Sequence, residues 1–292
     1  MRIRVLGLGL RLAILLLFAV FFVAPILWLV LAPTKSDQAL ITHSPFSFGS
    51  FHQVVLAWKH LDHFSNHIYR HWIENSLFYS LTATAITLVV GIPAGYGLAF
   101  GRFPGRKLIL SLTLISMIIP GAALVLPIYL ELSSFHLINS ALSVILPFSF
   151  FPFGVYLAYI YYITALPPGL LEAARVDGAN ELQTFVRVAM PLATPILALV
   201  FFFAFVSDWN NFFLPYVVLS NPHQLPITVG LWDLLASTPS FNPAVGGGGQ
   251  SLNIFKPELA IATVVAVLPV AVVFVASQRA LVRGLVGGGV KG

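Results

Sequence analysis

The chain contains no cysteine, which excludes disulfide bonds, thiolate metal sites and a catalytic thiol. Charged residues are also scarce, at 9% of the chain, whereas 58% of the residues are hydrophobic. Soluble domains contain roughly 45–50% apolar residues, so this composition indicates a protein that crosses a lipid bilayer several times. The formal net charge of +5 is then a property of the membrane flanks and does not indicate a nucleic-acid partner.

Six apolar segments are long enough to cross a hydrocarbon layer of ~30 Å, which takes about 20 helical residues. They lie at 12–32, 73–100, 108–130, 141–164, 192–219 and 259–278. The first segment is longer than the roughly 7–15 residues of a signal-peptide core, and it lacks a convincing cleavage site. The sequence therefore predicts an all-α membrane protein with six transmembrane helices, which form a single domain over residues 1–292.

Several predicted spans contain proline, which frees a backbone carbonyl and tends to kink a membrane helix. Ordinary membrane-helix usage is one interpretation, and a bundle of bent helices that rock around a central path is the other. The composition leaves both open. The prolines concerned are Pro25, Pro93, Pro120, Pro127, Pro147, Pro152 and Pro269.

Lysine and arginine are unequally distributed between the segments that join the spans. With the N-terminus in the cytoplasm, 11 of the 15 basic residues lie inside and 4 lie outside. Because cytoplasmic loops are enriched in these residues, we expect a multi-pass protein of the cell (inner) membrane with both termini cytoplasmic. The inside set is Arg2, Arg4, Arg11, Arg102, Arg106, Lys107, Arg175, Arg187, Arg279, Arg283 and Lys291, and the outside set is Lys35, Lys59, Arg70 and Lys256.

A charged island interrupts the apolar sequence at residues 172–181, where Glu172, Arg175, Asp177 and Glu181 lie close together. Each such group costs several kcal/mol at the bilayer centre, so we expect the island to face water or another protein. Helix-forming residues precede Gly178, which permits a backbone turn. A second helical run over 181–189 follows, and Pro191 is expected to stop it.

This island resembles the cytoplasmic EAA loop of ABC-importer permeases, in which Glu-Ala-Ala and Asp-Gly-Ala precede a hydrophobic stretch that ends in proline. Other segments resemble the carbohydrate-uptake branch, the relatives of the second maltose-transporter permease, and the resemblance covers about residues 70–292. The first outer segment, 43–71, does not resemble the family. The matching residues are Glu172-Ala173-Ala174, Asp177-Gly178-Ala179, Phe185, Pro191-Leu192, Pro195, Asn75-Ser76, Phe103-Pro104-Gly105-Arg106, Trp209-Asn210, Phe212, Leu225-Pro226, Val229-Gly230-Leu231 and Gly284-Leu285.

The resemblance implies a type I importer bundle that works with a second, related permease, two ATPase subunits and an external solute-binding protein that delivers a sugar. The chain has no Gly-x-x-x-x-Gly-Lys-[Ser/Thr] phosphate loop. We therefore expect no enzyme activity and no bound cofactor in this chain, with ATP and Mg²⁺ used by the partner ATPases. The solute stays open: a di- or oligosaccharide, an amino sugar, a polyol or a non-sugar solute such as a glycerol phosphate would suit the branch.

The same resemblance implies two contacts with the ATPase subunits. A coupling loop at 165–191 would act as a lever through Glu172, Ala173, Ala174, Asp177, Gly178 and Ala179. A plain amphipathic inner loop is the alternative. The C-terminal residues Gly289, Val290, Lys291 and Gly292 would insert between the ATPase subunits, and a frayed terminus is the alternative there.

Polar residues interrupt the fifth predicted span at Asp208, Trp209, Asn210 and Asn211. Asp208 lies about 11 residues from the outer end of that span, or roughly 16 Å at 1.5 Å per residue. A polar group near the midplane is expected to face the bundle interior or a water-filled path. These residues are candidates for the translocation path, and interhelical bonding that only fixes packing is the alternative.

Four histidines, His60, His63, His67 and His71, are spaced three, four and four residues apart, which predicts one helical face. Such a face can bind zinc, although a solvated or interfacial face is the simpler interpretation. Zinc there would favour a membrane metalloenzyme, but no His-Glu-x-x-His motif occurs. A secondary transporter or channel is a further alternative, although most spans lack the buried charges that such proteins use.

Overall fold

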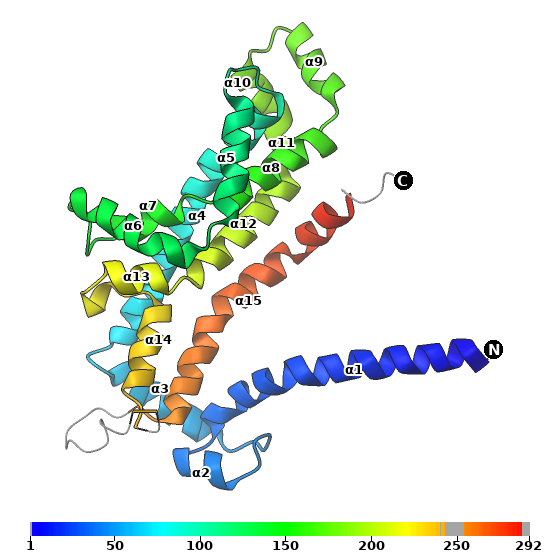
Figure 1. The fold of residues 1–292 in the computed structure, drawn as a ribbon. Helices are drawn as coiled ribbons and strands as arrows, with labels where there is room; N and C mark the ends of the chain where they lie inside the picture. The colour runs from blue at the N-terminus through cyan, green and yellow to red at the C-terminus, as the bar shows by residue number, and fades with distance from the viewer. Residues whose placement is uncertain (1, 240, 243–253, 288–292) are drawn as a thin grey trace. The chain divides into compact units, whose positions relative to one another are not determined.

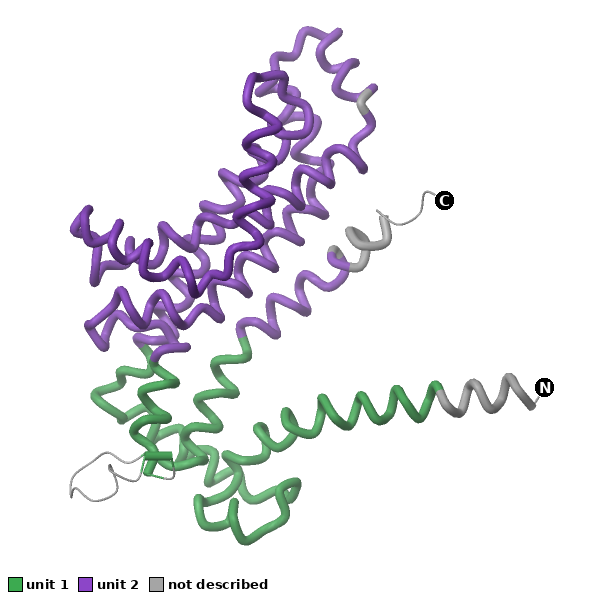
Figure 2. Tube along the Cα trace, viewed as in Figure 1, with its two compact units in different colours: residues 1–70, 230–268 green, residues 71–229, 269–292 purple. Residues whose placement is uncertain are grey.

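The computed structural model describes residues 2–239, 241–242 and 254–287, and in these ranges the regular structure is entirely helical (Figure 1). The chain divides into two compact units (Figure 2), one of residues 1–70 with 230–268 and the other of residues 71–229 with 269–292. The first unit contains α1 (Arg2–Leu31), η1 (Ala32–Thr34), α2 (Asp37–Thr42) and α3 (Phe51–His63). The second contains α5 (Arg106–Ile118), α6 (Gly121–Ser134), α7 (Leu142–Phe148), α8 (Pro152–Ala165), α9 (Pro168–Val176), α10 (Glu181–Thr184), the π-helical turn η2 (Phe185–Ala189), α11 (Met190–Leu192), α12 (Thr194–Trp209), α13 (Phe213–Val218) and η3 (Pro222–Gln224). The unit boundaries fall in or next to α4 (Ile68–Phe100), α14 (Ile227–Ala236) and α15 (Lys256–Gly287).

Four helical segments among the described residues are long and apolar enough to cross a membrane: Arg11–Thr34, Ile68–Phe100, Leu142–Ala165 and Lys256–Arg279. The count rises to six if each of two bent helix pairs is one span. Leu142–Ala165 contains α7 and α8 with a short interruption between them. The six predicted segments therefore all coincide with apolar helices, but three of them are not single continuous helices.

The predicted helix over 108–130 is wrong as a continuous rod. It consists of α5 and α6, which are bent by 110° at a short break. Ile119 adopts an extended conformation (φ −72°, ψ 123°) immediately before Pro120. A residue before proline is disfavoured in the helical region, and proline has no N–H to continue the helix. Pro93 and Pro269, by contrast, lie within helices that continue past them.

The predicted helix over 192–219 is also interrupted. Helix α12 ends at Trp209, and α13 begins only at Phe213. At its other end, α12 is bent by 78° against the preceding run Glu181–Leu192. The helical run was expected to stop at Pro191, but it continues through Pro191 and ends one residue later, at Leu192.

A close contact between α4 and α8 organises the core of the second unit. A Cβ atom on Gly95 would lie 2.5 Å from the Cβ of Ala158, so only glycine allows the two helices this approach. Tyr96 and Tyr162 pack edge to face beside it, with ring centroids 5.4 Å apart. Leu171 of α9 is 2% exposed and belongs to the same cluster. The core therefore ties α9 to the long helices.

The first turns of α4 hold a loop that lies 150 residues away in sequence. The amide of Asn75 donates to the carbonyl of Leu225 at 3.1 Å. The buried hydroxyl of Ser76 accepts a bond of 2.7 Å from the backbone N–H of Ile227, where α14 begins. Asn75-Ser76 and Leu225-Pro226, which resemble the same family, are thus two sides of one contact.

The outer segment of the first unit is cross-linked by charged groups. Arg70 donates from Nε and Nη2 to the two carboxylate oxygens of Asp62, at 2.5 and 2.7 Å. Lys256 lies 3.3 Å from Asp37. The buried ammonium group of Lys35 donates to two backbone carbonyls, at 2.8 and 2.9 Å. These contacts supplement the buried apolar residues of the segment, such as Ala57 and Leu61.

Candidate functional site

The charged island forms a helical hairpin of α9, a turn and α10, at one end of the long helices of the second unit (Figure 1). The predicted turn at Gly178 is confirmed, because its φ is +83°. The N–H of Gly178 donates to the carbonyl of Arg175 at 3.1 Å, and that of Ala179 donates to Ala174 at 3.0 Å. This pair of bonds is the Schellman arrangement that ends a helix with glycine in the left-handed region.

The second helix of the hairpin begins with a capping box. The side chain of Asn180 accepts from the N–H of Gln183 at 2.9 Å, and the side chain of Gln183 accepts from the N–H of Asn180 at 3.0 Å. Asn-x-x-Gln before a helical run is the sequence signal for this cap, which was not among the predicted features. The cap fixes the direction in which α10 leaves the turn.

An ion pair joins the two arms of the hairpin. Arg175 of α9 donates to the carboxylate of Glu181 of α10, at 3.0 and 3.4 Å. Glu181 raises the pKa of Arg175, first through the hydrogen bond and then through its charge. Because the pair is exposed, it contributes little to the free energy of folding. Its main effect is to align the arms.

The outer surface of the hairpin carries both acidic and apolar side chains. Glu172 and Asp177 are exposed. Val176 is 87% exposed and Leu182 is 71% exposed, whereas Leu171 is buried on the opposite side. Exposed apolar residues gathered on a polar segment outside a membrane indicate a protein contact surface.

The four candidate path residues separate into two pairs. Asp208 and Trp209 are buried, at 6% and 3% exposure. Asp208 accepts a bond of 3.3 Å from the hydroxyl of Thr84 on α4, and the indole of Trp209 stacks on Phe205. Asp208 thus joins α12 to α4, whereas the stacking contact of Trp209 lies within α12. The depth expected for Asp208 assumed a straight helix through residue 219, but α12 ends at Trp209.

Asn210 and Asn211 instead line a cavity of about 480 Å³. The cavity lies where two helix breaks meet, between α5 and α6 and between α12 and α13. The side chain of Asn210 is exposed, and its amide donates to the carbonyl of Val206 at 2.8 Å. The lining residues are Ser116, Ile119, Gly121, Ala122, Leu124, Val125, Ile128, Pro147, Phe148, Phe150, Pro152, Asn210, Asn211, Phe212, Phe213 and Leu214.

The four histidines do not share a helical face, so that prediction is wrong. Helix α3 ends at His63, and a turn with positive φ at Ser65, Asn66 and His67 precedes α4. His60 pairs with Glu258 at 3.1 Å, and His67 lies 3.3 Å from Asp62. Among the described residues, no group of three His, Cys, Asp or Glu side chains is placed to hold a metal ion.

The second predicted ATPase contact, Gly289 to Gly292, lies outside the described residues. The last described residue is Gly287, at the end of α15.

Comparison with known proteins places these features in a family. Residues 88–287 match the sequence model of the family described as binding-protein-dependent transport system inner membrane component. The arabinooligosaccharides transport system permease protein AraQ of Bacillus subtilis is 35% identical over 225 residues, which are 77% of this chain and 75% of AraQ. The diacetylchitobiose uptake system permease protein NgcG of Streptomyces coelicolor is 29% identical over 91% of this chain and 83% of NgcG.

The fold also resembles a chain of a bacterial ABC transporter involved in the import of the acidic polysaccharide alginate, with a TM-score of 0.79 and 22% identity. The match covers 94% of this chain and 96% of that one. The matched residues 88–287 contain both the hairpin and the cavity. The chain therefore belongs to the binding-protein-dependent transport system inner membrane components, and it is a multi-pass inner-membrane permease of an ABC importer rather than the subunit that hydrolyses ATP.

Proposed function

We propose that this permease carries an uncharged sugar or oligosaccharide inward, with a second, related permease, two ATPase subunits and an external solute-binding protein. The observation that carries the proposal is the α9–α10 hairpin. Its turn is held by a Schellman motif and a capping box, it is joined to the long helices through buried Leu171, and it carries exposed apolar residues among its charged ones. ATP hydrolysis elsewhere in the complex needs such an element to reach the membrane helices.

The hairpin acts as a lever in this proposal. Its turn and cap fix the angle between α9 and α10, so a force on the exposed side is transmitted to the helices and is not absorbed by the loop. Val176 and Leu182 would enter an apolar cleft of the ATPase, and Glu172 would pair with a basic group at its rim. Closure of the ATPase dimer then moves the helices that Leu171 contacts.

The proposed solute follows from the cavity at Asn210 and Asn211. Amide groups bind hydroxyls, and the phenylalanine rings around them offer the flat apolar surfaces on which sugar rings stack. The names of AraQ and NgcG refer to oligosaccharide uptake, which supports the same class. A glycerol phosphate is the weaker candidate, because no Lys or Arg is among the lining residues of this cavity.

Transport by the reconstituted complex tests the solute. We expect uptake of a neutral oligosaccharide, with sugar-stimulated ATP hydrolysis, and no uptake of glycerol phosphate. Asn211→Leu removes an amide from the cavity and is expected to raise the solute concentration needed for half-maximal uptake. Gln38→Ala, which removes an exposed amide from α2, is the matched control. Uptake of glycerol phosphate in preference to sugars would contradict the proposed solute class.

The lever has its own test in Glu172→Ala. Truncating one partner of a hydrogen-bonded interfacial charge pair typically costs ~2–5 kcal/mol of binding free energy, so we expect less ATPase to co-purify and uptake to fall. Because Glu172 is exposed, expression and thermal stability are expected to stay unchanged. Glu131→Gln on the exposed side of α6 is the control. Normal co-purification and normal uptake in Glu172→Ala would exclude this role.

A further inference from the structure

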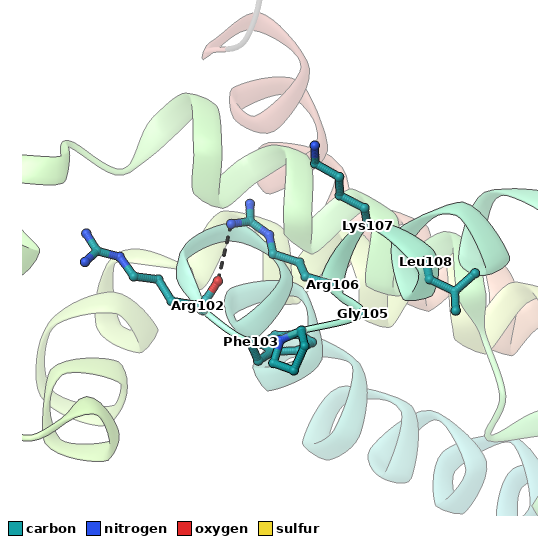
Figure 3. Close-up of a pocket in the computed structure, with 8 residues that line it drawn as sticks. Arg102, Phe103, Gly105, Arg106, Lys107 and Leu108 are labelled. Atoms are coloured by element: carbon teal, nitrogen blue, oxygen red, sulfur yellow. Dashed lines mark hydrogen bonds between the residues drawn. The ribbon is translucent and has the colours of Figure 1, made fainter.

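The loop between α4 and α5 carries three basic residues that do not line the solute cavity. One of them, Arg106, has a structural role. Its Nη2 donates to the carbonyl of Ala99 at 2.9 Å. Its Nη1 donates to the carbonyl of Gly101 at 3.3 Å, the bond drawn in Figure 3. A guanidinium group on the last carbonyls of a helix is favourable for both hydrogen bonding and the helix dipole. Arg106 therefore braces the loop against α4.

The other two basic residues, Arg102 and Lys107, are exposed. In the part of the chain that the structure describes, no carboxylate lies within ion-pair distance of either. Figure 3 shows both side chains extended away from the backbone of the loop, in different directions, so both must turn toward a shared ligand. With their neighbours they line a cavity of about 540 Å³, formed by residues 101–108. Arg102 also lines a cavity of about 710 Å³ that it shares with Arg175 and Glu181 of the hairpin. The loop thus offers two cations beside an open cavity.

A second cavity, of about 390 Å³ and mostly apolar, adjoins the first. Phe103 lines both cavities. The Phe103 ring lies over Gly101, where a Cβ atom would come within 3.0 Å of it. The second cavity runs between α4, α5 and the α7–α8 junction. Its lining is Thr87, Val90, Gly91, Ala94, Gly97, Leu98, Phe103, Ile109, Thr113, Ser149, Phe150, Phe151 and Val155.

The start of α5 shows where this pair of cavities lies relative to lipid. Leu108 is 63% exposed, Ile109 is 47% exposed and Leu112 is 55% exposed. Apolar side chains exposed directly after a basic loop are typical of the boundary between the hydrocarbon layer and the cytoplasmic headgroups. This order of residues favours a basic cavity at headgroup level and an apolar cavity that extends toward the acyl chains.

We propose that these two cavities together bind one anionic phospholipid of the inner leaflet. Arg102 and Lys107 bind the phosphate, with the planar guanidinium group donating two hydrogen bonds and the ammonium group supplying a point charge. One acyl chain lies beside Phe103 in the apolar cavity. A zwitterionic lipid binds less well, because its own cation is repelled by the same two side chains.

Native mass spectrometry of the purified full chain tests the site, with phosphatidylglycerol and phosphatidylcholine of identical acyl chains as probes. We expect phosphatidylglycerol to bind at least about tenfold more tightly. Each basic residue near an anionic lipid contributes roughly a fivefold gain, so Arg102→Gln with Lys107→Gln is expected to weaken this binding about 30-fold. The control variant, Arg11→Gln with Arg279→Gln, also removes two positive charges. It is expected to keep the preference for phosphatidylglycerol over phosphatidylcholine.

Gly97→Leu tests the acyl-chain half of the site. A Cβ atom on Gly97 meets nothing within 4 Å, and Gly97 lines the cavity, so the added side chain occupies part of its volume. We expect weaker phosphatidylglycerol binding, whereas Gly121→Leu, in the solute cavity, leaves it unchanged. Free glycerol phosphate, which lacks acyl chains, is not expected to compete. Equal binding of the two lipids, retained binding in the double glutamine variant or in Gly97→Leu, or competition by glycerol phosphate would each overturn the proposal.

Discussion

The hydroxyl of Ser76 accepts a hydrogen bond of 2.7 Å from the backbone N–H of Ile227, a residue 151 positions later in the chain. Ser76 is 2% exposed, so water cannot replace this bond. One buried oxygen on α4 therefore fixes the start of α14.

Ser76→Ala is expected to destabilise the protein by about 1–3 kcal/mol, because the buried N–H of Ile227 loses its acceptor. Thermal unfolding of the detergent-purified chain measures the change. Ser134→Ala is the control, since that exposed hydroxyl only donates back to the carbonyl of Glu131. An equal, small change in both variants would show that the Ser76 bond contributes little to stability.

Gly178→Val is expected to abolish most uptake while the chain still inserts and remains stable. The φ of +83° costs a β-branched residue about 1–3 kcal/mol, so the turn re-forms at another angle and the lever is misdirected. No atom lies within 4 Å of the added Cβ, so a steric clash is not the cause.

Two matched variants separate backbone strain from side-chain size at this turn. Gly178→Asn is expected to retain more uptake than Gly178→Val, because asparagine tolerates the left-handed region. Gly169→Val adds the same side chain to α9, also with nothing within 4 Å, where the backbone is not in that region. A loss of uptake in Gly169→Val as large as in Gly178→Val would argue against strain as the cause.

The Asp62–Arg70 pair predicts a stability difference that depends on pH. Arg70 lowers the pKa of Asp62 below its ordinary value, mainly by hydrogen bonding, with a smaller contribution from His67. A lowered carboxyl pKa stabilises the folded state above the unfolded value of about 3.9, and this stability is lost as the pH falls through the folded pKa. The unfolding midpoint of Asp62→Asn is therefore expected to lie below that of the wild type at about pH 7, and the gap is expected to shrink at about pH 3.

Glu131→Gln serves as the carboxyl control for this experiment, because Glu131 is exposed. It is expected to match the wild type at both pH values. A gap between Asp62→Asn and the wild type that stays constant with pH would mean that the charge of Asp62 does not stabilise the fold.

Reporter fusions test the topology and the nature of the bent pair α5–α6. Fusions after Lys107 and Lys291 are expected to read cytoplasmic, and fusions near Gln53 and Leu137 are expected to read external. If α5–α6 is a re-entrant loop rather than a span, the fusion near Leu137 reads cytoplasmic instead. A cytoplasmic reading there, or an external one at Lys291, would contradict the six-span arrangement.

Hydropathy was enough to locate the apolar helices, because each must satisfy its backbone in lipid. Hydropathy carries no information on the direction of the helix axis, so the 110° bend at Pro120 was not predicted. The presence of a proline does not by itself predict a break in a helix, since Pro93 and Pro269 lie in helices that continue past them.

Local backbone preference explains the other outcomes. Gly178 marked its turn because an apolar helix ended beside it, and Asn180 and Gln183 carried an unused cap signal. The histidine face failed because Ser65, Asn66 and His67 adopt positive φ, a state that asparagine and histidine reach more readily than most residues. The separate roles of Asp208 and Asn210 depend on the end of α12 between them, which hydropathy does not register.

The two helix breaks around the Asn210 cavity have a consequence for the energy of transport. Non-helical backbone at membrane depth is tolerated only where protein or water satisfies its polar groups. Ile119 and Gly121 from one break and Asn211 and Phe212 from the other line the same cavity. Both breaks in the helical backbone therefore lie beside one cavity. Under the proposed function, a sugar that enters this cavity replaces part of its lost hydration with bonds to polar groups there, so less of the work of ATP is spent on desolvation.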